Sequence, residues 1–191
     1  SVAVAGDLNG DGVDDVLVGS PGADVGNGIG HGTVSLFSGS DGSLLHTLAG
    51  PDGGQFGWAL VGGLDVNGDG TSDYFVGAKT ASLGGSWQGG AAYLVSGTDH
   101  SILHALAGTE DNAEFGTSVA WVDDAQGGSE VNLLVGAPLA DAGGIPGAGV
   151  VHLFSGTTGT HLFSSGGFGA GDSFGYSLAC PGDLNGDGFS D

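Results

Sequence analysis

The chain has 191 residues, of which 44 are glycine, and 39% of its residues are hydrophobic. A chain this apolar does not stay solvated, so the glycines are expected to separate many short buried strands. One basic residue stands against 22 acidic ones, for a net charge of −21. This excludes nucleic acid and anionic membrane surfaces as partners, because both are bound through Lys and Arg. No apolar run approaches the ~18 residues of a membrane span, so no membrane insertion is expected.

The first predicted elements are four short strands, each rich in Val, Leu or Phe and bounded by Gly, Asp or Asn. They are residues 1–5, 15–18, 33–38 and 43–48. The same pattern returns along the chain, because a Phe-Gly pair recurs at Phe56, Phe115 and Phe174, in steps of 59 residues. We read the chain as one domain over residues 1–191. Its approximate repeats are 1–55, 56–114, 115–173 and 174–191, the last of them partial.

Each repeat predicts an all-β unit of four antiparallel strands. Such a sheet cannot bury both of its faces alone, so repeated units are expected to stack radially as the blades of a β-propeller. Residues 177–191 match residues 1–15, so the chain holds about three blades plus the first strand of a fourth. We expect it to be part of a ring of about seven blades. The alternative is a six-bladed ring made by two chains joined head to tail.

Three loops share a nine-residue spelling, Asp-x-Asn-Gly-Asp-Gly-x-x-Asp. Oxygens at positions 1, 3 and 5 converge when the chain turns, glycine at position 6 permits the bend, and position 7 contributes a backbone carbonyl. A carboxylate at position 9 closes the set. Hard oxygen ligands of this kind suit Ca²⁺, and about three calcium sites are predicted. The expected ligands are Asp7, Asn9, Asp11, Val13, Asp15, Asp65, Asn67, Asp69, Thr71, Asp73, Asp183, Asn185, Asp187, Phe189 and Asp191.

These loops are not EF-hands. An EF-hand places its closing carboxylate at position 12, where this chain has Val18 and Val76 inside apolar strands. The loop of the third repeat, which begins at Asp124, departs from the pattern. Its position 5 is Gly128 and its position 9 is the neutral amide of Asn132, so we expect this loop to be empty or to bind calcium weakly.

The Phe-Gly pair, the nine-residue loop and a Gly-Ala-Pro marker, as at residues 136–138, occur in a fixed order. Together they resemble the FG-GAP repeats of integrin α-subunit propellers and their bacterial secreted relatives. The resemblance covers the whole chain. It implies a seven-bladed propeller in which calcium loops join the first two strands of a blade, and an extracellular role in adhesion or recognition of proteins or glycans. Lys79 stands where the marker has Pro, and the third loop lacks its ligands.

Few residues outside the loops suggest chemistry. Trp87 lies in a polar, Gly-rich segment and could stack on a sugar ring. His46 and His104 occupy equivalent positions where the third repeat has Phe163, which favours a packing role. The other four histidines fall at unmatched positions and predict no Cys/His metal cluster; they are His31, His100, His152 and His161.

The functional prediction is a secreted or cell-surface, calcium-binding recognition or adhesion module that is not an enzyme. No Gly-x-Ser-x-Gly elbow, phosphate loop or carboxylate pair free of the metal loops is present. Its partner is expected to be a protein or a carbohydrate, with a homo-oligomer or the remainder of a longer propeller chain covering the open blades. The alternatives are a structural subunit that self-associates through blade edges and a propeller lectin.

Overall fold

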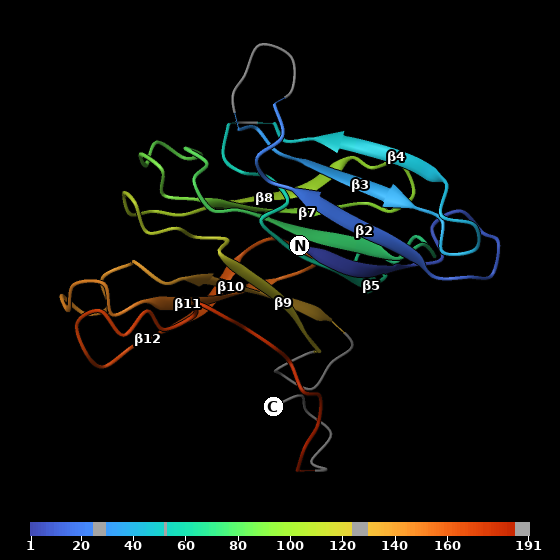
Figure 1. Ribbon diagram of the computed structural model, residues 1–191. Coiled ribbons are helices and arrows are strands. Elements are labelled where there is room, and N and C mark those ends of the chain that lie inside the picture. Colours follow the sequence, from blue (N-terminus) through green and yellow to red (C-terminus); the bar gives the residue numbers. More distant parts are fainter. Residues whose placement is uncertain (25–29, 52, 124–129, 186–191) are drawn as a thin grey trace.

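The computed structural model describes residues 1–24, 30–51, 53–123 and 130–185, and within these ranges the chain is all-β (Figure 1). Twelve strands form three four-stranded sheets. No helix long and apolar enough to cross a membrane occurs in the described ranges. The all-β prediction and the four-stranded repeat are confirmed.

The strands follow one another in chain order within each sheet. The first sheet contains β1 (Val2–Gly6), β2 (Asp15–Ser20), β3 (Thr33–Phe37) and β4 (Leu44–Ala49). The second contains β5 (Ala59–Leu64), β6 (Asp73–Ala78), β7 (Ala91–Val95) and β8 (Ile102–Ala107). The third contains β9 (Ser118–Asp123), β10 (Val131–Ala137), β11 (Val150–Ser155) and β12 (His161–Gly166).

All neighbouring strands pair antiparallel, but the first ladder of each sheet is not the same. The register shifts between Val4 and Gly6 in the β1–β2 pair and between Gly62 and Leu64 in the β5–β6 pair. The β9–β10 pair runs from Ser118–Gly136 to Asp123–Val131 without a shift. Extra residues therefore bend the chain just before the first two nine-residue loops and not before the third.

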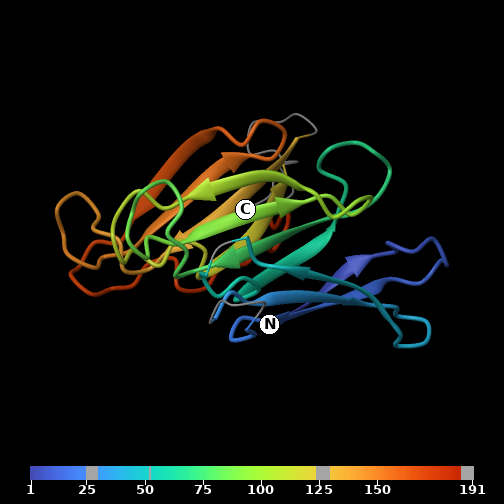
Figure 2. The same ribbon diagram turned by 90° about the horizontal axis from the view of Figure 1, so that it is seen from above.

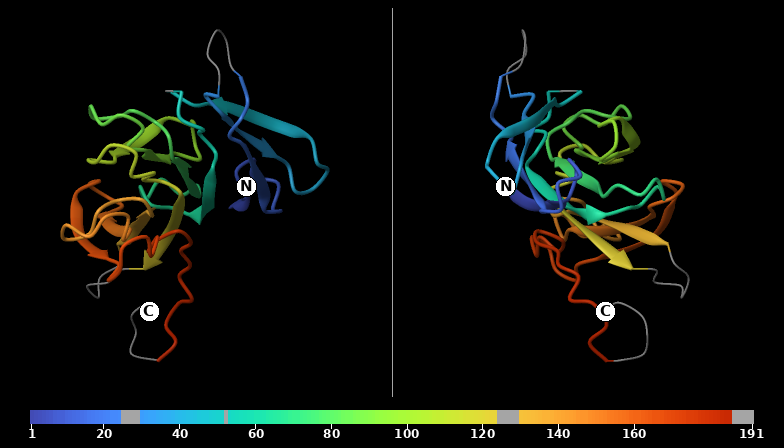
Figure 3. Two further views of the ribbon diagram at one scale, coloured as in Figure 1. Left: turned by 60° about the vertical axis from the view of Figure 1, so that its left-hand side comes forward. Right: turned by 90° about the vertical axis from the view of Figure 1, so that its right-hand side faces the viewer.

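The apolar core lies between the sheets, which stack in chain order (Figures 2 and 3). One cluster joins the first two sheets through Leu17, Phe56 and Tyr93, and a second joins the last two through Phe75 and Trp121. Strands β6 and β7 of the middle sheet are buried at every residue, whereas β4 and β12 are mostly exposed. Each sheet thus buries its apolar faces against its neighbours, because one sheet cannot bury both of its faces alone.

The two glycine motifs of the repeat meet at each junction between sheets. A Cβ on Gly77 would overlap the carbonyl oxygen of Gly116, which follows Phe115 in the next repeat. The same relation holds between Gly19 and Gly57. Gly116 adopts a φ of 89°, a conformation that favours glycine. The repeat spacing is therefore set by a contact that only glycine permits.

The predicted first strand of a fourth blade does not form. Residues 177–185 are irregular, although residues 177–181 match β1 in sequence. Strand β1 is held by pairing of Val2–Val4 with Val16–Val18 of β2. Among the described residues, 177–185 form no such ladder. The size of the complete ring stays a prediction.

Candidate metal centres in the β1–β2 and β5–β6 loops

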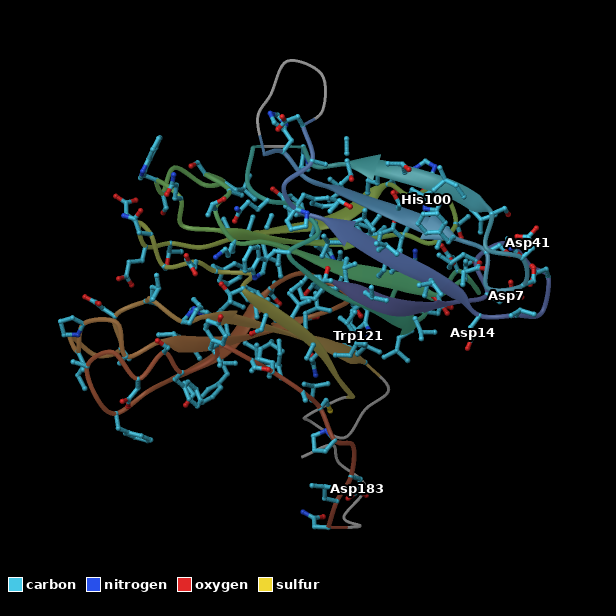
Figure 4. All side chains as sticks on the ribbon, viewed as in Figure 1. Asp7, Asp14, Asp41, His100, Trp121 and Asp183 are labelled. Carbon is cyan, nitrogen blue, oxygen red and sulfur yellow. The ribbon has the colours of Figure 1, made fainter. Side chains whose placement is uncertain are left out.

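The first two nine-residue loops lie at the same end of their sheets. Each joins the first strand of a sheet to the second, and each ends on the first residue of that second strand, Asp15 of β2 or Asp73 of β6. Both carboxylates are fully buried. Figure 4 shows Asp7, Asp14 and Asp41 at this end of the first sheet. The sequence therefore delivers a buried acid to the base of each loop.

The position 9 carboxylate anchors its loop to a neighbouring turn. Asp15 Oδ2 accepts hydrogen bonds from the backbone N–H groups of Leu8 and Asn9 at 2.9 and 3.2 Å. Asp15 Oδ1 accepts one from Gly39 N–H, in the β3–β4 turn, at 3.1 Å. A carboxylate has two oxygens and several lone pairs, so it can satisfy all three donors at once.

The second loop repeats this arrangement. Asp73 Oδ2 accepts from the N–H groups of Val66 and Asn67 at 2.9 and 3.1 Å, and Asp73 Oδ1 accepts from Gly97 N–H at 3.1 Å. The agreement between two independent stretches of sequence shows that the residue pattern, not a local accident, sets the loop conformation.

The position 1 carboxylate folds the middle of the loop around itself. Asp7 Oδ1 accepts from Gly10 and Asp11 N–H at 2.8 and 3.1 Å, and Oδ2 accepts from Gly12 N–H at 2.8 Å. Asp65 makes the equivalent three bonds at 2.8, 3.1 and 2.8 Å. These bonds keep the carboxylate inside the turn, where its remaining lone pairs stay available.

Positions 3, 5 and 9 converge. Asn9 Nδ2 lies 3.1 Å from Asp11 Oδ2 and 3.4 Å from Asp15 Oδ1. In the second loop Asn67 Nδ2 lies 2.9 Å from Asp69 Oδ2. Two carboxylates of the first loop thus share one weakly positive amide group. A divalent cation would neutralise them far better, so the donor set and its placement fit a hard cation.

The ligand assignment as a whole stays a prediction. Within the described residues, no three His, Cys, Asp or Glu side chains gather as a preformed metal cluster. At position 7, the Val13 and Thr71 N–H groups donate to Asp11 Oδ1 and Asp69 Oδ1, each at 2.9 Å. Their carbonyl ligation is therefore still an expectation from the loop pattern.

Hydrogen bonding lowers and burial raises the pKa values of the loop acids. The Ser40 hydroxyl, which donates to Asp11 Oδ2 at 2.7 Å, is the main cause that lowers the pKa of Asp11. The Asn67 amide chiefly lowers the pKa of Asp69. Burial raises the pKa of Asp73, against the opposing effect of its backbone donors. In the second loop the exposed Asp69 is thus held ionised beside the buried Asp73, which is costly to charge.

The third and fourth loops are only partly described. Residues 124–129 and 186–191, which include Asp124, Asp187, Phe189 and Asp191, lie outside the described residues. In the third sheet Asn132 is buried, and its Nδ2 has no hydrogen-bond acceptor among the described residues.

The donor equivalent to Gly39 is Gly156 N–H, which donates to Val131 O at 3.0 Å. Asp183 lies on the segment that leaves the third sheet, away from Asp7 (Figure 4). The predicted weak third site and the predicted fourth-loop site therefore stay predictions.

Trp87, the predicted glycan contact, lies in the loop between β6 and β7. Its side chain is 65% exposed, and its backbone N–H donates to Asp111 Oδ1 at 2.7 Å. The loop is thus tied down while the indole stays accessible. Its role in ligand binding stays a prediction.

Two histidine pairs were not apparent from sequence spacing. His46 of β4 stacks on His100 of the β7–β8 turn, with ring centroids 4.0 Å apart. His152 and His161 approach within 3.4 Å. The sequence did not predict these pairs, and the expectation of no Cys/His metal cluster stays a prediction. Only the offset between strands β11 and β12 could have indicated the second pair.

Comparison with known proteins places this architecture. A model described as "FG-GAP repeat" matches residues 1–37. Integrin alpha-5 of Xenopus laevis is 31% identical over 166 residues, which cover 83% of this chain and 15% of the integrin. Integrin alpha-V of Gallus gallus is 31% identical over 207 residues, covering 100% of this chain and 19% of the integrin.

A phosphatidylinositol-glycan-specific phospholipase D of Bos taurus is also 31% identical, over 168 residues, covering 80% of this chain and 20% of that protein. The chain thus spans at most a fifth of the length of these relatives.

Three four-stranded antiparallel sheets stacked on one another are consecutive blades of a β-propeller. With the repeat match and the integrin relatives, the chain belongs to the FG-GAP repeat β-propeller family.

Proposed function

We propose that the chain is a calcium-stabilised, non-enzymatic recognition module of an extracellular or cell-surface protein. The observation that carries this is the matching fold of the first two nine-residue loops, in which the position 1 and position 9 carboxylates accept the same sets of backbone N–H groups. The similarity to integrin alpha chains supports an extracellular adhesion role. The net charge of −21 favours uptake of cations.

Calcium would be held by the loop acids and amides. Asp7, Asn9, Asp11 and Asp15 would hold one ion in the first loop, and the second loop would use the matching residues. The bound cation would supply charge neutralisation between carboxylates that otherwise repel one another. Because each loop joins the first two strands of a blade, its ordering would stiffen this end of the propeller.

Calcium binding is tested on metal-free protein by isothermal titration and by native mass spectrometry. Asp69→Ala is expected to remove one ion, because it deletes the position 5 carboxylate. Asp99→Ala is the matched control, since Asp99 lies in the β7–β8 turn of the same sheet, outside the nine-residue loop, and accepts a hydrogen bond from Ser101 N–H. Fewer than one calcium per chain in the unmodified protein, or full binding by Asp69→Ala, would contradict the proposal.

The recognition surface is proposed to include the β6–β7 loop. Trp87 is the most exposed tryptophan of the described residues, and an accessible indole can stack on a sugar or cover an apolar side chain. A glycan array and pull-down from cell-surface extracts would be run with the unmodified chain and with Trp87→Ala. Loss of a specific ligand in the variant supports this surface; an unchanged ligand profile places recognition elsewhere.

A second candidate function is self-association through the outer sheet faces. Val2, Val4 and Leu44 of the first sheet are 70, 57 and 58% exposed, and Phe163 of the third is 61% exposed. Apolar side chains of this kind need a cover. Light scattering with calcium and with chelator tests this candidate: a defined dimer or larger ring supports it, and a monomer at all concentrations contradicts it.

A further inference from the structure

The third sheet brings two histidines together from adjacent strands. His152 lies on β11 and His161 is the first residue of β12. His161 pairs with Phe154 across the ladder, two residues from His152, so both imidazoles lie on one face of the sheet. His152 Nδ1 and His161 Nε2 are 3.4 Å apart, and the ring planes are inclined at 63°.

Aromatic neighbours hold both imidazoles in place. The Phe115 ring centroid lies 5.5 Å from that of His152, and the Phe154 centroid lies 5.2 Å from that of His161. The pair borders a cavity of about 230 Å³ whose lining also includes Thr109 and Ser164. His152 is half-buried and His161 is exposed, so small ions can reach the two nitrogens.

The spacing of the nitrogens suits a bridging metal ion. Without a metal the two nitrogens form a hydrogen bond that, at 3.4 Å, is longer than the ~2.7–3.2 Å of ordinary N–H hydrogen bonds. Two zinc–nitrogen bonds of about 2.05 Å that meet at a tetrahedral angle place their nitrogens about 3.3 Å apart. Burial chiefly, and the neighbouring His161 secondarily, lowers the pKa of His152 to about 4. His152 is therefore neutral near pH 7, and the neutral ring is the form that binds metals.

We propose that His152 Nδ1 and His161 Nε2 form a two-imidazole site for a late first-row divalent ion such as Zn²⁺, Ni²⁺ or Cu²⁺. Imidazole nitrogens prefer these ions to Ca²⁺, which takes oxygen ligands, so the site is chemically distinct from the nine-residue loops. Two protein ligands leave the other coordination positions open toward the cavity. Water or a donor group of a second molecule would fill them.

The His46–His100 pair provides an internal control. Those rings are stacked with centroids 4.0 Å apart and planes inclined at only 20°. The in-plane lone pairs of stacked imidazoles cannot both point at one ion between the rings, so this pair is not expected to chelate a metal. The proposal concerns histidines alone and is independent of calcium binding by the loops.

The test is titration of the tag-free chain with ZnCl₂, and separately with CuCl₂, in saturating calcium that occupies the acidic loops. We expect one zinc or copper ion per chain, with copper bound more tightly. His161→Gln should weaken binding at least about tenfold, because it removes half of the protein ligand set. His46→Gln should leave it unchanged. Equal binding by the unmodified protein and His161→Gln would overturn the proposal.

A measurement on the unmodified chain guards against a folding defect in the variant. Long-range ¹H–¹⁵N spectra of the histidine side chains report metal coordination at each ring nitrogen. Zinc should shift the resonances of His152 Nδ1 and His161 Nε2 and leave those of His46 and His100 in place. No shift at either nitrogen in excess zinc, or equal shifts at all histidines, would contradict a specific site.

Discussion

The nine-residue loops that precede β2 and β6 occupy the same place as the segment that precedes β10, in three sheets that are otherwise alike. In the first two, a buried carboxylate at position 9 accepts three backbone N–H groups. In the third, the buried side chain is Asn132, and the neighbouring turn donates to the Val131 carbonyl. The register shift of the β1–β2 and β5–β6 ladders is also absent from the β9–β10 ladder.

This difference shows that the position 9 residue serves the fold as well as the proposed metal. A carboxylate can take three donors, whereas an amide has a single acceptor oxygen and brings two donors of its own. Among the residues that the structure describes, the Asn132 Nδ2 accordingly has no hydrogen-bond acceptor. Four predictions test this comparison, beginning with the position 9 carboxylate.

The largest effect is expected from removing the anchor itself. Asp73→Ala leaves the N–H groups of Val66 and Asn67 in the β5–β6 loop, and of Gly97 in the β7–β8 turn, without their acceptor. We expect it to lower the free energy of unfolding by about 3 kcal/mol or more. Asp73→Asn, which imitates the third sheet, should cost less because one acceptor oxygen remains. Urea unfolding in chelator isolates this effect from metal binding. Equal stability of Asp73→Ala and the unmodified chain would show that the anchor is dispensable.

The second largest effect is expected from calcium removal, which should affect the first two nine-residue loops and not the third sheet. With chelator, amide hydrogen exchange is expected to speed up at Gly10 and Gly12, whose N–H groups bond to Asp7, and at their counterparts in the second loop. The control is Gly156, whose N–H bonds to a backbone carbonyl. Exchange at Gly156 should change little. Uniform acceleration across all three sheets would instead indicate global loosening, and no change anywhere would indicate loops that fold without metal.

Acid sensitivity has a histidine component that must be separated from the loops. Burial, and then His46, lowers the pKa of His100, which also faces the Tyr74 hydroxyl and its own neighbour Asp99. Because the unfolded histidine protonates near pH 6.5 while the folded one resists, the unfolded state binds more protons. Stability should therefore fall as the pH drops below about 6.5.

His100→Gly removes the contribution of His100 to acid sensitivity, and glycine readily adopts the backbone conformation of this position. His100 has a φ of 60°, and the equivalent turn of the third sheet has Gly159. Thermal unfolding between pH 7 and 5 should become flatter in this variant, while stability at pH 7 changes little. An unchanged pH profile would assign the acid sensitivity to other groups, namely the loop carboxylates and His152, whose pKa burial also lowers.

The smallest effect is expected at Ser40. Its hydroxyl donates to Asp11 Oδ2 at 2.7 Å from the β3–β4 turn, but Asp11 is exposed. Ser40→Ala should slightly weaken calcium binding in the first loop and leave the second loop unaffected. Titration of this variant in the Asp69→Ala background removes the contribution of the second loop, and comparison with Asp69→Ala alone isolates the effect on the first. Complete loss of calcium binding by the first loop in Ser40→Ala would mean that the β3–β4 turn, and not the position 9 carboxylate, organises the site.

Much of the architecture could be predicted from the sequence. Strands placed at residues 15–18 and 33–38 correspond to β2 and β3, because local alternation and glycine punctuation mark their limits. The nine-residue loops could be recognised because their glycines and acids are close in sequence. The strand expected at residues 177–181 does not form. A strand needs a partner strand as well as strand propensity, and these residues pair with none among the described residues.

The chain order of Asp, Asn and Gly determined the loop turns, since every interaction that shapes a loop lies within nine residues or in the adjacent turn. The same residues are the basis of the proposed calcium binding. Only the tertiary structure decided which side chains meet across strands and sheets. The stacking of His46 on His100 and the approach of His152 to His161 depend on register and on how one sheet packs against the next. Such contacts are set by the geometry of the whole ladder, which no local pattern encodes.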